Sequence, residues 1–97
     1  MVTQKSVPPQ KAQSGGKPPA LFVDAMLGRL ARWLRLAGYD TAFWRAGADE
    51  ELIAAAREQG RVIVTKDRGL AGRRGVDAVR IDAETLDEQI TEARAAL

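Results

Sequence analysis

Three aspartates hold equivalent positions in the sequence, each at a boundary between a predicted strand and a predicted helix. Asp24 ends a short apolar run, Asp49 opens a helical pattern, and Asp67 follows the strand-like segment of residues 61–65. Because the carboxyl ends of parallel strands lie along one edge of a sheet, we expect the three side chains to converge. Gathered carboxylates repel one another unless a cation neutralises them, and ligation by oxygen alone suits Mg²⁺ or Mn²⁺. The spacing therefore predicts a divalent-metal site, which could activate water and bind a phosphodiester oxygen.

Each acid also has a structural interpretation. Asp24 and Asp49 would serve as helix N-caps, because an aspartate at that position accepts hydrogen bonds from free backbone N–H groups. Glu50 and Glu51 would be favoured in a first helical turn by the helix dipole. Taken one at a time, capping accounts for these residues, but Asp67 adds a further acid at the same predicted edge. We therefore favour the metal site.

Two more acids and two tryptophans are weaker candidates. Asp82 follows the last predicted strand and would be an additional ligand, whereas Asp40 is expected to order a turn. Trp33 and Trp44 are expected to pack between helix and sheet. The alternative for Trp44 is stacking on a nucleobase.

Arginine is concentrated in the first predicted helix. Arg29, Arg32 and Arg35 recur at three-residue spacing, and Arg68 follows the last of the three aspartates. A solvated helix face would account for this pattern. Alternatively, Arg29 and Arg32 lie one to two helical turns from Asp24 and would hold a phosphate backbone beside the metal. Arginine suits this role because it binds phosphate through two parallel hydrogen bonds.

Composition excludes several kinds of active site. The 97 residues include no cysteine and no histidine, which rules out a disulfide framework, a thiolate zinc site and a Ser-His-Asp triad. Carboxylates and metal-activated water remain as routes to hydrolysis. The formal net charge is +2, but residues 1–19 contain three lysines and no acid, which leaves the rest of the chain near −1.

Residues 1–19 are rich in Pro, Gly, Gln, Ser and Lys and are predicted to be a flexible basic tail. Such a tail would be a solubilising extension or an arm that binds nucleic acid or a protein. The apolar stretches of the chain are far shorter than the ~20 residues of a membrane span, and the N-terminal residues show no hydrophobic signal core. We expect a cytoplasmic protein without membrane contact.

Hydrophobic patterning after residue 19 alternates between strands and helices. The predicted strands are residues 20–23, 40–44, 61–65 and 78–81, and the predicted helices are residues 26–37, 49–59, 68–74 and 84–96. Gly38 and Gly60 are expected to end the first and second helices. This alternation, with short connections, implies an α/β fold with a parallel sheet, right-handed crossovers and helices on both faces.

The segment FVDAMLGRLARWLRLAGYDTAFW, followed by ADEELIAAAREQGRVIVTKDRGLA, resembles the Mut7-C RNase domain family, a branch of the PIN-like nucleases. The resemblance covers residues 21–81. Its first part is specific, whereas the Asp-Glu-Glu-Leu and Thr-x-Asp pieces are shared with other PIN-like proteins, including VapC-type toxins. The resemblance implies a three-layer α/β/α domain with a four-stranded, mainly parallel sheet, and Mg²⁺- or Mn²⁺-dependent cleavage of RNA. The family's acids would fall on Asp24, Asp49 and Asp67, with Glu50 as an alternative second ligand.

RNA contacts would come from basic and polar residues around these acids. The predicted RNA-binding residues are Arg29, Arg32, Arg35, Thr65, Lys66 and Arg68. The chain departs from the family pattern in one respect: members often carry a C-terminal zinc ribbon with four cysteines, and this sequence has no cysteine. Residues 20–97 are therefore expected to form a PIN-like domain that lacks the ribbon.

The leading hypothesis is a ribonuclease that hydrolyses RNA phosphodiester bonds through carboxylate-bound Mg²⁺ or Mn²⁺. One alternative is a catalytically inactive RNA- or protein-binding PIN-like module. Another is a VapC-like toxin held by an antitoxin. The partners considered are RNA and a protein, the latter either an antitoxin or a second copy of the chain in a homodimer.

Overall fold

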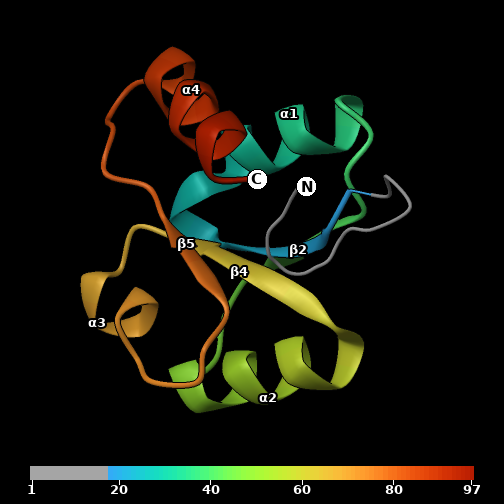
Figure 1. Ribbon diagram of the computed structural model, residues 1–97, viewed down its shortest axis with the longest axis vertical. Helices are drawn as coiled ribbons and strands as arrows, with labels where there is room; N and C mark the ends of the chain where they lie inside the picture. Colours follow the sequence, from blue (N-terminus) through green and yellow to red (C-terminus); the bar gives the residue numbers. More distant parts are fainter. Residues whose placement is uncertain (1–17) are drawn as a thin grey trace, which may run out of the picture.

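Parallel strands form the centre of the computed structural model, which describes residues 18–97 (Figure 1). The strands are β2 (Ala20–Asp24), β3 (Thr41–Trp44), β4 (Arg61–Thr65) and β5 (Ala78–Arg80), and they lie in the order β3-β2-β4-β5. Every pairing is parallel. The helices are the 3-10 turn η1 (Ala25–Leu27), α1 (Gly28–Leu36), α2 (Asp49–Gln59), α3 (Arg68–Ala71) and α4 (Leu86–Ala96). The predicted α/β class is confirmed, while residues 1–17 of the predicted tail lie outside the described residues.

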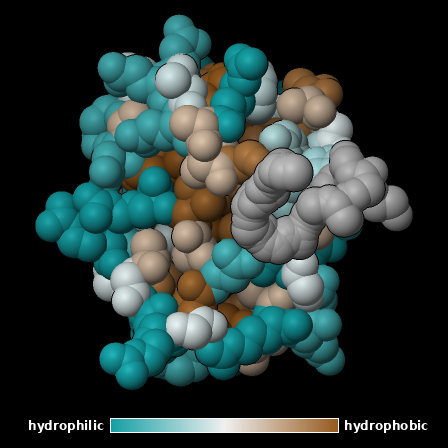
Figure 2. Space-filling model, viewed as in Figure 1, coloured by the Kyte–Doolittle hydropathy of each residue, from teal (hydrophilic) through white to brown (hydrophobic). Residues whose placement is uncertain are grey.

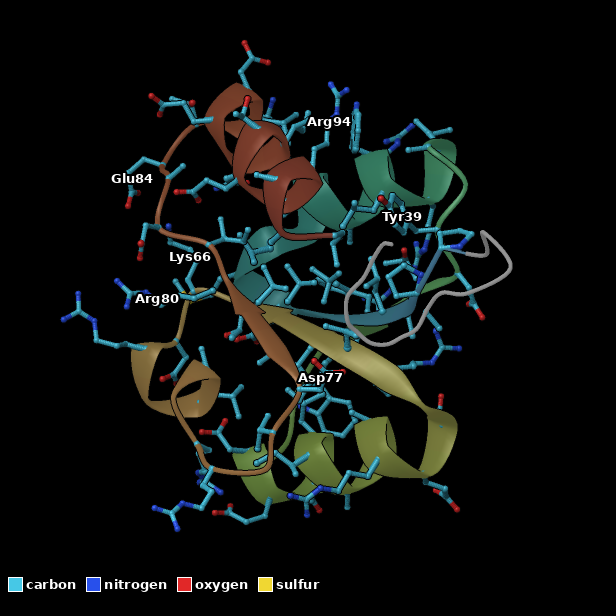
Figure 3. All side chains as sticks on the ribbon, in the orientation of Figure 1. Tyr39, Lys66, Asp77, Arg80, Glu84 and Arg94 are labelled. Carbon is cyan, nitrogen blue, oxygen red and sulfur yellow. The ribbon has the colours of Figure 1, made fainter. Side chains whose placement is uncertain are left out.

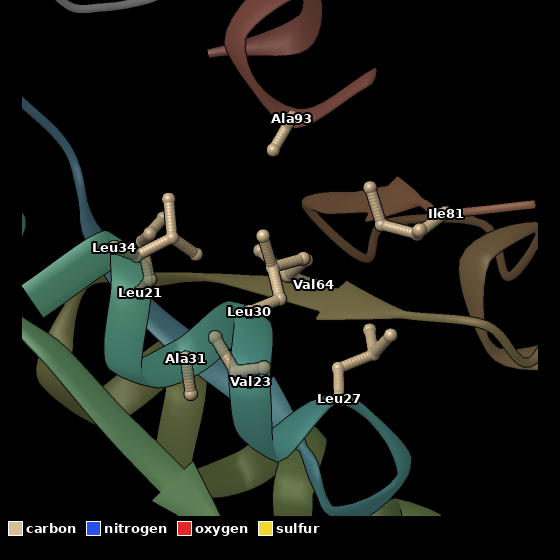
Figure 4. Packing of buried hydrophobic residues seen from close by; sticks show 9 residues of the cluster. All are labelled: Leu21, Val23, Leu27, Leu30, Ala31, Leu34, Val64, Ile81 and Ala93. Atoms are coloured by element: carbon tan, nitrogen blue, oxygen red, sulfur yellow. The ribbon is translucent and has the colours of Figure 1, made fainter. Parts of the chain in front are cut away.

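Helices cover both faces of the sheet, so the three-layer arrangement is confirmed. Helices α1 and α4 lie on one face, and α2 and α3 lie on the other (Figure 1). The α1 side encloses the buried residues Leu21, Val23, Leu27, Leu30, Ala31, Leu34, Val64, Ile81 and Ala93 (Figure 4). The α2 side encloses Phe22, Leu52, Ile53, Ala56, Ile63 and Leu70. Successive strand residues therefore point to opposite cores, and each large aliphatic side chain buried in this way contributes roughly 1.5–3 kcal/mol.

Some helix boundaries differ from the predicted ones for local reasons. The first helix opens with a 3-10 turn, and its N-cap Asp24 accepts the N–H of Ala25 at 2.7 Å. The last helix begins later than predicted because the Thr85 side chain caps its N-terminus. Helix α3 is only 4 residues long and ends before Gly72, a residue that disfavours helix. The segment 49–59 and the segment 61–65 form a helix and a strand with the predicted bounds.

The strand order creates a switch point at the carboxyl edge of the sheet. The chain passes from β2 to β3 on one side, and then crosses to β4 on the other side of β2. Helix α1 leaves β2 toward one face of the sheet, while α3 leaves β4 toward the opposite face (Figure 1). In open α/β sheets a crevice forms where neighbouring strands send their helices to opposite faces, and ligands bind there. The ends of β2 and β4, which carry Asp24 and Asp67, are at this point.

The face of the molecule that presents the free edge of β5 is mostly hydrophilic. Apolar side chains gather near the centre of this view, where β5 runs between the α4 layer and the α3 layer (Figure 2). Within residues 18–97, every helix is too short or too polar to reach across a lipid bilayer.

Candidate active site

Two hydrogen bonds hold the carboxylate of Asp24 at the end of β2. Oδ1 accepts the N–H of Ala25 at 2.7 Å, and Oδ2 accepts the hydroxyl of Thr65 at 2.9 Å. The Thr65 oxygen also accepts the N–H of Asp67 at 3.0 Å. Asp67 Oδ1 in turn accepts the N–H of Leu70 at 3.1 Å, which caps α3. Asp24, Thr65 and Asp67 thus form one hydrogen-bonded chain across the carboxyl ends of β2 and β4, which we call the acid bridge.

Thr65 positions the acids and does not make the RNA contact predicted for it. Its side chain is 0% exposed, so RNA cannot reach it. A hydroxyl has one hydrogen, and here that hydrogen goes to Asp24 while a lone pair accepts from Asp67. Both acids also act as N-caps, as the structural interpretation of Asp24 proposed. Capping leaves room for a metal, because Asp67 Oδ2 accepts no hydrogen bond from residues 18–97.

Asp49 lies at the same edge of the sheet but outside the acid bridge. The N-cap of α2 is Ala48, whose N–H donates to the Glu51 carboxylate at 3.0 Å, so the N-cap role predicted for Asp49 is wrong by one residue. Trp44 pairs with Asp24, and this register brings the loop that leads to Asp49 to the carboxyl edge. Among the described residues no three acidic side chains are grouped so that they could hold a metal ion. The structure therefore brings two of the three predicted acids together and leaves the third separate.

Glu50, the alternative second ligand, is engaged by a basic residue. Its Oε2 accepts a hydrogen bond from Arg73 Nη2 at 3.0 Å. This hydrogen bond is the main cause that lowers the pKa of Glu50 below its ordinary value, and the charge of Arg73 adds to it. A lowered pKa in the folded state means that the pair stabilises the fold above the ordinary glutamate pKa. That stabilisation is lost as the pH falls through the lowered value.

If the metal-dependent RNA cleavage expected from the sequence occurs, Glu50→Gln should change its rate by about twofold at most, because an exposed ion pair contributes little. Asp49→Asn is the matched variant, and a much larger loss is expected there, since Asp49 is the third candidate ligand at this edge, in the first turn of α2. Initial rates of both variants against wild type test this. The melting temperatures of wild type and Glu50→Gln should also converge at acidic pH. A larger rate loss in Glu50→Gln than in Asp49→Asn would instead make Glu50 the ligand.

Lys66 anchors the loop between β5 and α4. Its Nζ lies 2.8 Å from the carbonyl oxygen of Ala83, 3.4 Å from that of Asp82 and 3.4 Å from the Glu84 carboxylate. The Lys66 side chain is 18% exposed, and Figure 3 shows it on the same side of the molecule as Arg80 and Glu84. Lys66 therefore anchors the loop in this structure, and the RNA contact expected of it from the sequence stays a prediction.

We expect Lys66→Met to lower the free energy of unfolding by about 1–2 kcal/mol, the usual cost of losing hydrogen bonds from a charged donor. The salt dependence of RNA binding should stay the same, because a lysine held by the loop neutralises no phosphate. Denaturant unfolding and a salt series of RNA affinities measure the two quantities, with Lys66→Arg as the charge-preserving control. Unchanged stability together with a shallower salt dependence would identify Lys66 as an RNA contact after all.

The arginines predicted to bind RNA lie at different levels of the fold. Arg29 and Arg68 are exposed at the N-terminal ends of α1 and α3, close to the carboxyl edge. Arg32 is exposed near the middle of α1. Arg35 lies at the opposite edge, where its Nε donates to the carbonyl oxygen of Thr41 at 2.9 Å. Arg35 is therefore tied to the amino end of β3, away from the acid bridge.

Arg45, the first residue after β3, is not among the RNA-binding residues predicted from the sequence. This arginine is exposed, and its Cζ lies 5.6 Å from the centre of the Phe43 ring. Its position directly after a strand is the signal that could have found it. The rule that identified the aspartates at strand ends applies equally to a cation there.

The tryptophans pack as expected. Trp44 meets Phe22 edge-on, with ring centres 5.7 Å apart and planes at 87°, and Trp33 packs against the core on the α1 side. The backbone of the next loop presses on Trp44, because a Cβ atom on Gly47 would lie 2.9 Å from Trp44 Cζ2. The indole Nε1 is buried and has no hydrogen-bond partner among residues 18–97.

The weaker acidic candidates are both in ion pairs. Asp82 Oδ1 accepts a hydrogen bond from Arg80 Nε at 2.7 Å. Asp40 pairs with Arg61 at 3.1 Å, beside the amino ends of the strands.

The acid bridge has the donor chemistry that a hard divalent cation requires. Its available ligands are carboxylate oxygens, and the chain has no cysteine or histidine that would favour a softer metal. Mg²⁺ is usually held by one or two carboxylates, with water and substrate phosphate completing its shell. Asp24 and Asp67 are therefore the candidate protein ligands for such a cation, and Asp49 is the third candidate at the same edge.

The fold and this site together define a small α/β/α domain whose acidic residues lie at the switch point of a parallel sheet. A family model described as Mut7-C RNAse domain matches residues 19–97. The chain belongs to the Mut7-C RNAse domain family, which confirms the resemblance noted from the sequence and indicates a ribonuclease-like function. No curated protein and no solved structure gave a match.

Proposed function

We propose that this protein is a metal-dependent ribonuclease that hydrolyses RNA phosphodiester bonds at the acid bridge. The observation that carries the proposal is the hydrogen-bonded chain from Asp24 through Thr65 to Asp67, placed at the switch point of the sheet. Asp24 and Asp67 would hold Mg²⁺ or Mn²⁺, and Asp49 would approach from the start of α2. A cytoplasmic location is part of the proposal, because it fits an RNA substrate.

Each residue of the site has a separate task in this proposal. When bound, the ion supplies charge that stabilises the phosphoryl group and lowers the pKa of nearby water. Thr65 fixes the orientation of Asp24 and the turn that carries Asp67, so the two carboxylates need not reorganise during the reaction. Arg29 and Arg68, exposed at the ends of the helices that flank the bridge, would bind substrate phosphate oxygens.

The test is a cleavage assay of the full chain on RNA with Mg²⁺, with Mn²⁺ and with EDTA, combined with thermal melting under the same conditions. We expect cleavage with either ion, none with EDTA, and a higher melting temperature when the ion is present, because a ligand of the folded state stabilises it. Cleavage that EDTA leaves unchanged would contradict the proposed metal dependence.

A catalytically inactive binding module is the second candidate. The observation that favours it is that no three acidic side chains among residues 18–97 form a metal-holding group. RNA binding without cleavage, together with a melting temperature that Mn²⁺ does not raise, would select this candidate over the ribonuclease.

A further inference from the structure

One stripe of helix α1 faces the edge strand β3. Gly28, Arg32 and Arg35 follow one another at the i, i+4 and i+7 spacing that places residues on the same side of a helix. A Cβ atom on Gly28 would lie 3.6 Å from Phe43 Cζ, and Arg35 Nε donates to the Thr41 carbonyl. Both ends of the stripe thus contact β3. Arg32, between them, lies along the flank where α1 meets the outer strand of the sheet.

Arg45 extends this stripe toward the carboxyl edge. Its guanidinium stacks on Phe43, the ring that also meets Gly28, with 5.6 Å between Arg45 Cζ and the ring centre. A guanidinium stacked on an aromatic ring keeps its N–H groups available at its rim for an anionic acceptor. Arg45, Arg32 and Arg35 therefore form a row along the β3 flank of α1, which we call the arginine track.

The track carries positive charge that the rest of the fold does not share. Between residues 25 and 48 the acidic residue is Asp40, and Arg61 already pairs with it at 3.1 Å. Residues 18–97 as a whole contain slightly more acidic than basic side chains. Four other cations of the fold are in ion pairs: Arg61, Lys66, Arg73 and Arg80. Within the described part of the chain, neither Arg32 nor Arg45 forms a salt bridge.

The track begins beside the acid bridge. Trp44 pairs with Asp24 across neighbouring strands, so the backbone of Arg45 is one residue beyond the level of Asp24 and one strand away. Adjacent strands are about 4.8 Å apart, which is within the reach of an arginine side chain and a phosphate. A polyanion bound at the acid bridge could therefore continue over the end of β3 and along α1.

We propose that the arginine track binds the backbone of the RNA substrate beyond the scissile phosphate. This inference rests on the proposed ribonuclease function and adds the path of the bound strand. The proposal predicts a dependence on substrate length. Arg32 and Arg45 should increase the affinity for an RNA long enough to reach the flank of α1. They should not affect the affinity for an oligonucleotide that covers the acid bridge alone. The contacts are to phosphates, so they do not select a base sequence.

The test compares Arg32→Ala/Arg45→Ala with a charge-matched control, Arg74→Ala/Arg94→Ala, whose residues are exposed on the α3–β5 loop and on α4. All forms carry Asp24→Asn, so that binding is measured without turnover. We expect the track variant to weaken binding of long RNA and to reduce the slope of log affinity against log salt by about 1.4, at about 0.7 for each lost phosphate contact on a single strand. Binding of the short oligonucleotide should not change, and thermal melting checks that both variants fold.

An equal loss of RNA affinity in the control variant would overturn the proposal. An equal loss of affinity for short and long RNA in the track variant would overturn it too. So would unchanged binding of long RNA by the track variant, the result expected if this surface serves a protein partner. Cleavage assays of the same substitutions in the protein with Asp24 unchanged distinguish the ribonuclease proposal from the RNA-path proposal. If the protein binds long RNA through the track but never cleaves it with Mg²⁺ or Mn²⁺, the ribonuclease proposal fails and the RNA path stands.

Discussion

Asp24→Asn is expected to lower metal-dependent RNA cleavage by about two to three orders of magnitude, the scale on which loss of one preorganised electrostatic contact acts in enzymes. Asparagine keeps the size of the side chain and one carbonyl oxygen but removes the negative charge. The oxygen that accepts the Thr65 hydroxyl at 2.9 Å is also the one placed between the two strands of the acid bridge. A neutral amide there can no longer balance a divalent cation.

The metal-free protein should lose a modest amount of stability in this variant. Asn is as good an N-cap as Asp, so the hydrogen bond from the N–H of Ala25 can be kept, but the amide NH₂ that replaces the second carboxylate oxygen cannot accept the Thr65 hydroxyl. Losing this hydrogen bond costs about 1 kcal/mol, so without metal we expect a melting temperature about 4–8 °C below that of wild type. We also expect loss of the increase that Mn²⁺ gives to wild type. Cleavage rates and melting curves, each with Mn²⁺ and with EDTA, measure both effects.

Asp77→Asn is the matched control, because Asp77 precedes β5 at the opposite end of the sheet and is exposed (Figure 3). It should cleave RNA like wild type and keep the Mn²⁺-induced increase in melting temperature. If Asp24→Asn retained both properties as well, the acid bridge would not be the metal site, and the ribonuclease proposal in its present form would be wrong.

Local sequence signals predicted the elements that carry the acids. The strand of residues 61–65 was recovered because its β-branched run follows Gly60, which ends α2 with a φ of 67°. Asp24 and Asp67 were recognised for a similar reason, since a polar residue ending an apolar run needs no tertiary information. Helix α3 was overestimated because its glycines interrupt a pattern that otherwise reads as helical.

The hydrogen-bond partners of the side chains could not be predicted from local sequence. Lys66 looked like a free cation beside an acid, but its acceptors are on a loop 16 to 18 residues further along the chain. Arg32 and Arg35 belong to the same series of arginines at three-residue spacing. Arg35 nevertheless donates a hydrogen bond to the backbone of β3, because it lies further along α1, at the amino end of the sheet. The separation of Asp49 from the other acids depends on the strand order, which alternation of strands and helices does not specify.

Thr65→Val is expected to damage both stability and activity, because the hydroxyl of Thr65 is the link between the two acids. Valine keeps the shape of the side chain but removes the donor to Asp24 and the acceptor for the N–H of Asp67. Leaving such groups without partners costs about 1–3 kcal/mol of unfolding free energy. In a domain of this size, each kcal/mol lowers the melting temperature by about 4–8 °C. Cleavage should fall about 10–100-fold, the usual effect of losing a residue that orients metal ligands.

Thr65→Ser separates the contribution of the Thr65 hydroxyl from that of its buried methyl group. Serine restores both hydrogen bonds and loses one buried methyl, at a cost of about 1 kcal/mol. If the acid bridge works through the hydroxyl, Thr65→Ser will be somewhat less stable than wild type yet cleave at a similar rate, while Thr65→Val is deficient in both. Equal cleavage by the two variants, each measured well below its melting temperature, would show that Asp24 and Asp67 reach their working positions without the bridge. In that case the metal, rather than the fold, would be what brings the carboxylates together.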